Sequence, residues 1–372
     1  MRLSKTCMAV CILLFSAWAA AAGEPADVMT SFETVDLGHG VLAFIAPETR
    51  SQLVSGNSVA IFGEDGVLVV DTGEFPRLTR QMIAEIRKRT DKPVRFVVNT
   101  HWHNDHMMGN SVYRQEFPGV AIVSTPSTKA NGDVYNPEFM ELQKKSLPAA
   151  TARIKQMLAS GKNASGQALD AATTQRYKTL LADIEEFEPL MAEFRYESPN
   201  VTFTDRMDID LGKRTVQVLF VGKGNTAGDA VVYVPDAKLL ATGDLVVMPV
   251  PFATTSFVED WIHTLDKLQT FEVANLVPGH GAVQHDFACV RTMEDTLKSL
   301  LSQVKNAVAQ GKSLEETQQA VNLKREKAAA VGDSLVRSLN WDNFFQQSAV
   351  TSAYNELKGI PVDENPFPKK SQ

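Results

Sequence analysis

Three of the seven histidines in this 372-residue chain lie within six consecutive residues, His101-Trp-His103-Asn-Asp105-His106. An imidazole nitrogen and a carboxylate oxygen are both ordinary ligands of divalent transition metals near neutral pH. The background frequency of histidine makes such a cluster a rare chance event, so a polar surface turn explains it poorly. The cluster therefore predicts a metal site.

The spacing within the cluster suits two metal ions. Residues 95–100 are rich in β-branched residues and predict a short buried strand that ends where the histidines begin. In a loop after that strand, His101 and His103 can point to one side while Asp105 and His106 point to another. Two ions about 3.5–4 Å apart favour hydrolysis, because they share one bridging hydroxide.

Two later segments are candidates to complete the site. Thr242-Gly-Asp244 follows a predicted strand at 238–241, and His280 lies between two glycines, where the backbone can turn tightly. Each is weak alone, since a capping aspartate or a loop histidine is the ordinary reading of such residues. Because they follow the histidine run in this order, each after a strand, we expect both to be ligands.

Short strands on either side of a helical segment must position these residues. We expect strands at 41–45, 58–62, 67–70, 201–204, 215–221, 230–234 and 238–241, the second and third forming a hairpin. We expect an amphipathic helix at 77–90 and two long helices within 131–198, broken near 161–165. From residue 290 onward the chain is predicted helical, with breaks near Gly311 and Gly332. Two β-rich blocks of similar content predict two sheets packed face to face with outer helices.

The N-terminal residues predict an export signal. Arg2 and Lys5 precede an apolar run that ends in alanines, the pattern of a signal peptide cleaved after Ala22. This run is short for a membrane span, and no later segment is long and apolar enough for one. We therefore expect a periplasmic or secreted protein, with no stable membrane insertion after cleavage.

Cleavage would also change the composition of the mature chain. It would remove Cys7 and Cys11 and leave only Cys289, so no intramolecular disulfide could form. Loss of Arg2 and Lys5 takes the formal net charge from −7 to −9, which argues against non-specific nucleic-acid binding. The expected partner is a small-molecule substrate. We expect Cys289 to be a buried packing residue.

Together these motifs resemble those of the metallo-β-lactamase superfamily of hydrolases. The resemblance covers about residues 32–126 and 201–287 and rests on Asp71-Thr-Gly73, the histidine run, 222–229, Thr242-Gly-Asp244 and Pro278-Gly-His-Gly281. It implies the α+β fold of that family, a four-layer αββα sandwich, in a domain at about 30–290. The helices at 131–198 would then be an insertion over the cleft, and residues 291–372 a helical C-terminal extension.

The resemblance also implies a role for each ligand. It implies two Zn²⁺ sites and a bridge between them: site one from His101 and His103, site two from Asp105, His106 and His280, and the bridge from Asp244. Asp105 would in addition orient the attacking nucleophile and shuttle a proton. Asp71 and Asp229 would lie behind the ligands, and Asp71 would orient a ligand histidine.

One position departs from the family pattern. Asn225 stands where the family usually has a third imidazole of site one. An amide oxygen is a weaker ligand than imidazole, so site one should hold metal less tightly than site two. Three outcomes stay open: two zinc ions with Asn225, or a water held by it, as a ligand; one zinc ion in site two; or a degenerate, inactive member. Among the other histidines, His285 could line the pocket, whereas His39 and His263 are read as structural and surface residues.

The predicted reaction is hydrolysis of an ester, lactone, thioester or amide-type bond by a metal-activated hydroxide. Hydrolysis of β-lactams is the alternative. It comes second because one β-lactamase subclass has a cysteine in place of Asp244 and a lysine soon after it, and this chain has neither. Met107, Met108 and the segment 249–252 could form an apolar rim or pack in the core. Two further classes stay open: a non-catalytic metal- or ligand-binding protein, motivated by Asn225, and an interaction scaffold that uses the added helices.

Overall fold

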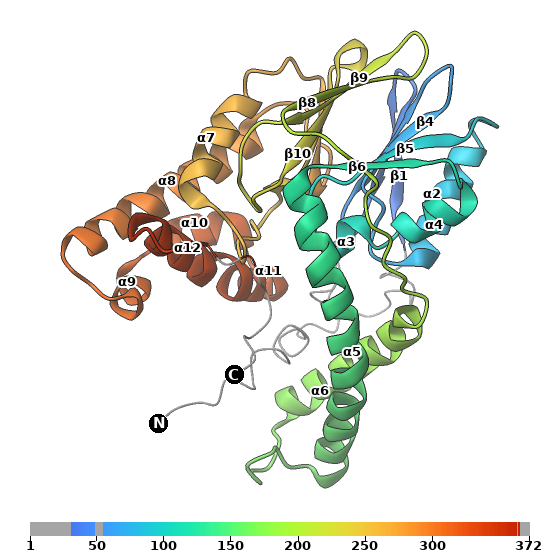
Figure 1. Cartoon of the computed structure of the whole chain (residues 1–372). Helices are drawn as coiled ribbons and strands as arrows, with labels where there is room; N and C mark the ends of the chain where they lie inside the picture. The colour runs from blue at the N-terminus through green and yellow to red at the C-terminus, as the bar shows by residue number, and fades with distance from the viewer. Residues whose placement is uncertain (1–30, 49–54, 363, 365–372) are drawn as a thin grey trace.

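The computed structural model describes residues 31–48, 55–362 and 364, and its strands form one sheet of seven strands and one of five (Figure 1). The first sheet has the order β1 (Glu33–Gly38), β2 (Val41–Ile45), β3 (Ser58–Phe62), β4 (Val67–Val70), β5 (Val94–Val98), β6 (Ala121–Ser124) and β7 (Val201–Thr202). The second has the order β12 (Asn275–His280), β11 (Leu239–Val247), β10 (Ala230–Val234), β9 (Thr215–Phe220) and β8 (Arg206–Asp210).

The two sheets pack face to face, and helices cover both outer faces. Strand β10 shows how the sequence achieves this: Ala230, Val232 and Val234 point into the core between the sheets, whereas Val231 and Tyr233 pack on the outer side. Alternate residues of a strand point to opposite faces, so a continuous apolar run feeds two cores. Helices α2 (Pro76–Arg87) and α4 (Asn110–Glu116) cover the first sheet, and α7 (Val258–Leu268) and α8 (Ala288–Ala309) cover the second. The predicted αββα sandwich is confirmed.

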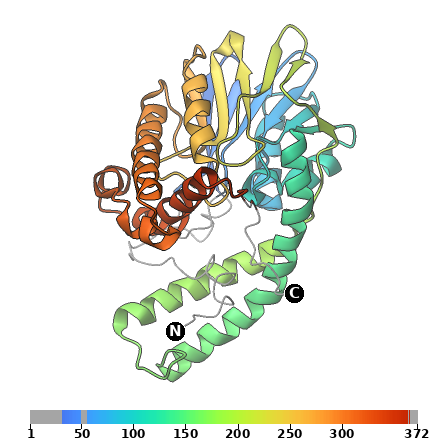
Figure 2. The ribbon, with the colours of Figure 1, turned by 60° about the vertical axis from the view of Figure 1, so that its left-hand side comes forward.

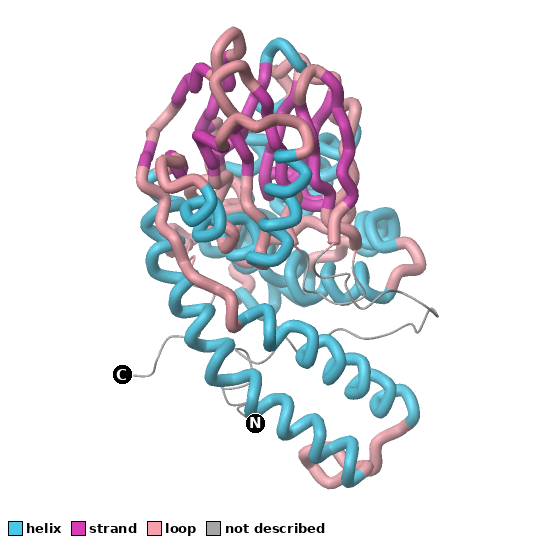
Figure 3. The backbone as a smooth tube through the Cα atoms, turned by 90° about the vertical axis from the view of Figure 1, so that its right-hand side faces the viewer, coloured by secondary structure: helices cyan, strands magenta, loops and turns pink. Residues whose placement is uncertain are grey.

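A helical hairpin projects from this sandwich between β6 and β7 (Figures 2 and 3). It consists of α5 (Pro126–Ser160) and α6 (Ala171–Met191), and Gly161 ends α5 in the left-handed conformation, with φ of 65°. Helix α5 begins before residue 131 because the Thr125 side chain accepts a hydrogen bond from Thr128 N–H and Pro126 suits the first helical turn. That the hairpin caps the cleft stays a prediction.

The C-terminal residues form a second helical layer beside α7 and α8 (Figure 1). Its elements are α9 (Leu314–Ala320), α10 (Lys324–Val331), α11 (Leu335–Asn340), a π-helix at Trp341–Gln346 and α12 (Gln347–Leu357). Trp341 and Phe345 are buried in the same core as Cys289, as expected of packing residues. The helices break near Gly311 and Gly332, as predicted, and both glycines have positive φ.

One predicted boundary is wrong, and it bears on the site. The sequence predicted Thr242-Gly-Asp244 to follow a strand at 238–241, but β11 continues to Val247 and contains this motif. The pairing of β11 with β12 shifts register around Gly243, which has φ of 51°. This irregularity re-aims the following side chain, so Asp244 can leave the sheet without ending the strand.

None of the helices in the described ranges is long and apolar enough to cross a membrane. The predicted signal peptide, with Cys7 and Cys11, lies outside the described residues, and the predicted domain boundaries stay predictions.

Candidate metal centre

The histidine run lies at one edge of the first sheet. Strands β4 and β5 are parallel neighbours, so Asp71 after β4 and His101 after β5 meet at the same edge. His103 is the residue before α3 (Asn104–Met107), and Asp105 and His106 therefore lie in the first turn of this short helix. The change from an extended loop to a helical turn sends the two halves of the run in different directions.

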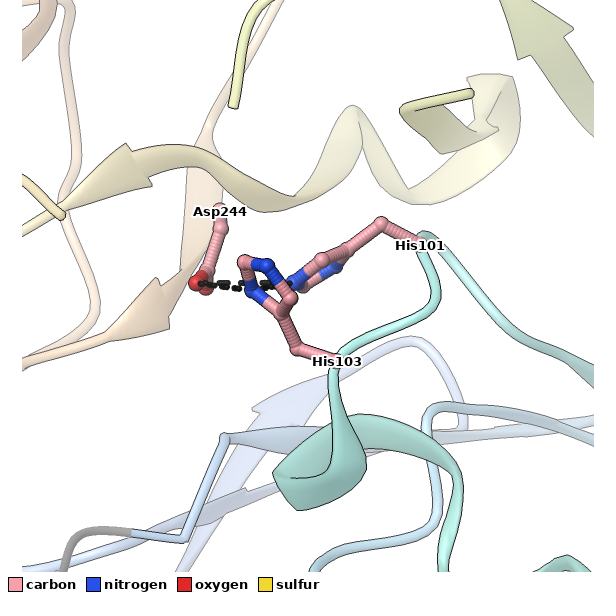
Figure 4. A group of neighbouring side chains, drawn as sticks. All are labelled: His101, His103 and Asp244. Atoms are coloured by element: carbon pink, nitrogen blue, oxygen red, sulfur yellow. Dashed lines mark hydrogen bonds and ion pairs between the residues drawn. The ribbon is translucent and has the colours of Figure 1, made fainter. Parts of the chain in front are cut away.

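The first half of the run forms one ligand group with Asp244 of β11 (Figure 4). His101 Nε2 lies 2.9 Å from His103 Nδ1. Asp244 Oδ2 lies 3.5 Å from His101 Nε2 and 3.9 Å from His103 Nδ1. Three buried side chains thus bring potential metal-ligand atoms within 4.8 Å of one another.

The second half forms another group with His280 of β12. Asp105 Oδ2 lies 3.0 Å from His280 Nε2 and 3.3 Å from His106 Nε2, and the two imidazole nitrogens are 3.3 Å apart. The other oxygen of Asp244, Oδ1, lies 3.2 Å from His106 Nε2 and 3.5 Å from His280 Nε2. Asp244 therefore presents one oxygen to each group, the arrangement that a bridging ligand requires.

These residues fit a pair of divalent ions. In each group the ligand atoms all lie within 4.8 Å of one another, and each group combines two imidazole nitrogens with a carboxylate oxygen. Within the described residues, Asp244 Oδ1 is buried and makes no hydrogen bond, although a buried carboxylate oxygen without a hydrogen bond is costly. A cation at this point would satisfy it.

Asp71 and Thr100 contact the imidazole nitrogens of His106 and His101 that face away from the two ligand groups. Asp71 Oδ2 lies 2.8 Å from His106 Nδ1, which leaves Nε2 of that ring for a metal. The Thr100 N–H and hydroxyl donate to the two Asp71 oxygens, each at 2.8 Å, and the hydroxyl oxygen lies 3.0 Å from His101 Nδ1. Asp71 thus contacts the His106 ring directly and is linked through Thr100 to His101 of the other group.

The second ring nitrogen of His103, Nε2, also has a hydrogen-bond partner. Its Nε2 lies 3.2 Å from the Thr255 hydroxyl, which donates to the Asn225 carbonyl at 3.0 Å. The rings of Trp102 and Phe252 lie 4.6 and 5.4 Å from the His103 ring, edge to face. Phe252 is half-buried and brings an apolar surface to site one.

Asn225 is fully buried beside this group, and its two amide atoms have different surroundings. Its Nδ2 donates to the Phe252 carbonyl at 2.6 Å, whereas its Oδ1 has no hydrogen-bond partner within the described residues. Asp229 lies one step further out: its carboxylate accepts from the N–H and hydroxyl of Thr226, and so holds the loop that follows Asn225.

The protein's own charges set the ligands' protonation. Burial alone would raise the pKa of Asp105, but the adjacent His106 and His280 bring it below its usual value. Burial alone would lower the pKa of His106, but nearby carboxylates, Asp105 foremost, raise it well above its usual value. Burial and the charge of His106 lower the pKa of His101 to about 4, so this ring is neutral at pH 7 and available as a ligand. A divalent ion would take the place of the proton that His106 otherwise holds.

Two glycines allow the groups to approach. A Cβ on Gly279 would lie 2.0 Å from Asp244 Oδ1, and one on Gly56 would lie 2.4 Å from the His106 ring. Only a glycine fits at either position.

Sequence reasoning did not single out Thr100, Thr255, Gly56 or Glu74. Glu74 is buried and accepts a hydrogen bond from the Asn104 side chain at 2.8 Å; burial, together with the charge of Asp105, raises its pKa well above its usual value. Thr100 and Glu74 adjoin recognised motifs, and that adjacency was the available signal. Thr255 had no such signal.

Met107 and Met108 are fully buried, so of the two alternatives predicted for them, apolar rim or core packing, core packing is the one observed. His285 is exposed and hydrogen-bonds Asn275 Oδ1 at 3.0 Å, away from both ligand groups, so its reading as a pocket residue is wrong. His263 is exposed, as expected.

The chain was compared with known proteins. Linear primary-alkylsulfatase of Pseudomonas sp. (strain ATCC 19151) is 27% identical in an alignment 232 residues long that covers 58% of this chain and 40% of that protein, so the match spans less than half of that protein's length. Metallo-beta-lactamase type 2 of Bacillus sp. (strain 170) is 22% identical over 251 residues, 66% of this chain and 74% of that protein. A solved metallo-beta-lactamase from Pontibacter korlensis aligns over 72% of this chain and 99% of its own at 19% identity, with a TM-score of 0.49. A family model of the metallo-beta-lactamase superfamily matches residues 52–280, more than half of the sequence. The chain therefore belongs to the metallo-β-lactamase superfamily of hydrolases.

Proposed function

We propose that the chain is an exported hydrolase that holds two zinc ions and cleaves an ester, lactone, thioester or amide-type bond. The observation that carries the two-metal proposal is the position of Asp244, with one oxygen toward each of two ligand groups. Imidazole nitrogens and carboxylate oxygens in groups of this kind favour zinc. When bound, the ions would supply Lewis-acid activation of a water and of the scissile bond.

The residues around the ions have distinct tasks. Asp105 Oδ2 lies between His106 and His280, and a carboxylate at this position orients the attacking water and accepts its proton. Asp71 keeps the His106 ring in the tautomer that presents Nε2. Asn225 stands beside site one with an unpartnered amide oxygen, which supports its proposed role as a ligand of the ion or of the substrate.

A second substrate class is a sulfate ester of an alkyl chain. The relative named linear primary-alkylsulfatase favours it, and the half-buried ring of Phe252, 5.4 Å from His103, would suit an alkyl group next to site one. The relatives named metallo-beta-lactamase make a β-lactam the third class to examine.

The test is a panel of chromogenic substrates with controlled zinc. The purified mature chain is assayed on a nitrophenyl ester, a lactone, a long-chain alkyl sulfate and a chromogenic cephalosporin, before and after chelation and zinc return. We expect turnover of at least one substrate, abolished by chelator and restored by zinc. In Asp105→Asn, kcat should fall by roughly 10²-fold or more, whereas the exposed Asp210→Asn should change nothing. Bound zinc without turnover on any substrate would favour the non-catalytic alternative.

Export has its own test. The apolar run before Gly23 supports a cleaved signal. Mass spectrometry of the protein from a periplasmic extract should give a chain that begins at Gly23, and an uncleaved chain would contradict export by this route.

A further inference from the structure

At two points the C-terminal helical extension contacts residues that adjoin site one, although its sequence contains none of the candidate ligands. We propose that the extension positions site one, acting through Glu364 and Phe344. This proposal rests on the metal centre described above and adds two positioning residues to it.

Glu364 is held by donors from three separate elements. The indole N–H of Trp102 donates to Oε2 at 3.2 Å and the backbone N–H of Ala227 donates to the same oxygen at 3.0 Å. The side-chain amide of Asn131, on α5, donates to Oε1 at 2.9 Å. Trp102 is 4% exposed, so its N–H points into the protein and needs an internal acceptor.

These donors flank site one. Trp102 is the residue between the ligands His101 and His103, and Ala227 lies two residues after Asn225. The carboxylate of Glu364 therefore joins the loop of the two ligands to the loop of Asn225. Charge-assisted hydrogen bonds are about twice as strong as neutral ones, so a carboxylate is an effective clamp between two loops.

The placement of Glu364 carries an electrostatic cost. Burial raises the pKa of Asp229 well above its usual value, and the nearby negative charge of Glu364 acts in the same direction; Asp229 supports the same loop through Thr226. Two carboxylates near one short loop repel each other, and the three N–H donors offset that repulsion.

Phe344 approaches from the other side. Its ring lies 5.4 Å from the Phe252 ring, and its carbonyl accepts the N–H of Ala253 at 2.8 Å. The Phe252 ring in turn lies against the His103 ring, and the Phe252 carbonyl accepts a hydrogen bond from Asn225 Nδ2. Phe344 lies in the π-helix, a rare local conformation that occurs often at functional sites. Both contacts of the extension thus converge on His103 and Asn225.

The experiment measures zinc affinity by competition with a chromophoric chelator, on the full mature chain. His101→Ala and His280→Ala first identify which binding step belongs to each site. In Glu364→Ala we expect site one to bind zinc roughly 10-fold more weakly, the loss typical of a residue that orients metal ligands, with site two unchanged. Added acetate should restore most of the affinity, because it can fill the space of the missing carboxylate.

Two matched variants separate positioning from general effects. Glu364→Gln fills the space with an amide, so its loss should be smaller and acetate should not reverse it. Glu315→Ala, an exposed glutamate of the same extension, should bind zinc as the wild type does. Phe344→Ala should weaken site one with no response to acetate.

Unchanged site-one affinity in Glu364→Ala would overturn the proposal, as would an equal loss at both sites that acetate does not reverse. Failure of the hydrolase proposal has a different signature, because it would appear as absent turnover in a wild type that still binds zinc.

Discussion

Asp71→Asn tests whether the contacts behind the ligands set metal affinity. The Asp71 carboxylate is 2% exposed and makes three contacts of 2.8 Å, with Thr100 N, Thr100 Oγ1 and His106 Nδ1. Asparagine keeps the shape but replaces one oxygen with a donor. If the amide nitrogen faces Thr100 N–H, two donors collide. If it faces His106 Nδ1, the ring must move its proton to Nε2, the atom that would bind metal.

Either orientation costs at least one buried charge-assisted hydrogen bond, about 1.5–3 kcal/mol. At about 1.4 kcal/mol per tenfold, site two should bind zinc roughly 10- to 100-fold more weakly. The assay is the chelator competition, with thermal unfolding measured in parallel and the exposed Asp210→Asn as control. Wild-type zinc affinity and unchanged stability in Asp71→Asn would refute the reasoning, because they would mean that the carboxylate's charge is not needed.

Three further perturbations follow from the same structure. Asn225→His should raise zinc affinity at site one by roughly 10-fold, since imidazole is a better ligand than an amide; unchanged affinity would place residue 225 away from the ion. Gly279→Ala should lower zinc stoichiometry and destabilise the fold by about 1–3 kcal/mol, because the new methyl group would overlap Asp244 Oδ1. The control Gly119→Ala should change neither quantity, because the space around that Cβ is open. Burial raises the pKa of Glu356 to about 7, so the folded state binds its proton more tightly than the unfolded state does, and this residue's contribution to stability should fall as pH rises from about 4.5 to 7. Glu356→Gln should flatten that part of the pH profile of Tm, and an unaltered slope would contradict the assignment.

The part of the site that sequence alone determined is the part that is local. In the run from His101 to His106, the end of a strand and the spacing of the residues predicted that the two halves of the run point to different sides, whereas the helical turn of α3 that achieves this came from the structure. The apolar runs of β4, β5 and β10 likewise predict strands, and the two β-rich blocks of similar content predict the layered sandwich. The roles of Asp244 and His280 came from the order of motifs along the chain and from the family resemblance.

Contacts between loops that are distant in sequence depend on the packing of the whole chain. Thr255 against His103, and Glu364 against Trp102, join residues separated by 152 and 262 positions. No periodicity encodes such pairs, because a side-chain hydrogen bond between two loops depends on how the sheets and helices beneath them pack. The register shift at Gly243 has a related origin: glycine permits the positive φ, and the pairing of β11 with β12 determines that the strand bends there. Local spacing thus specified which atoms could bind a metal, and packing specified how firmly each of them is held.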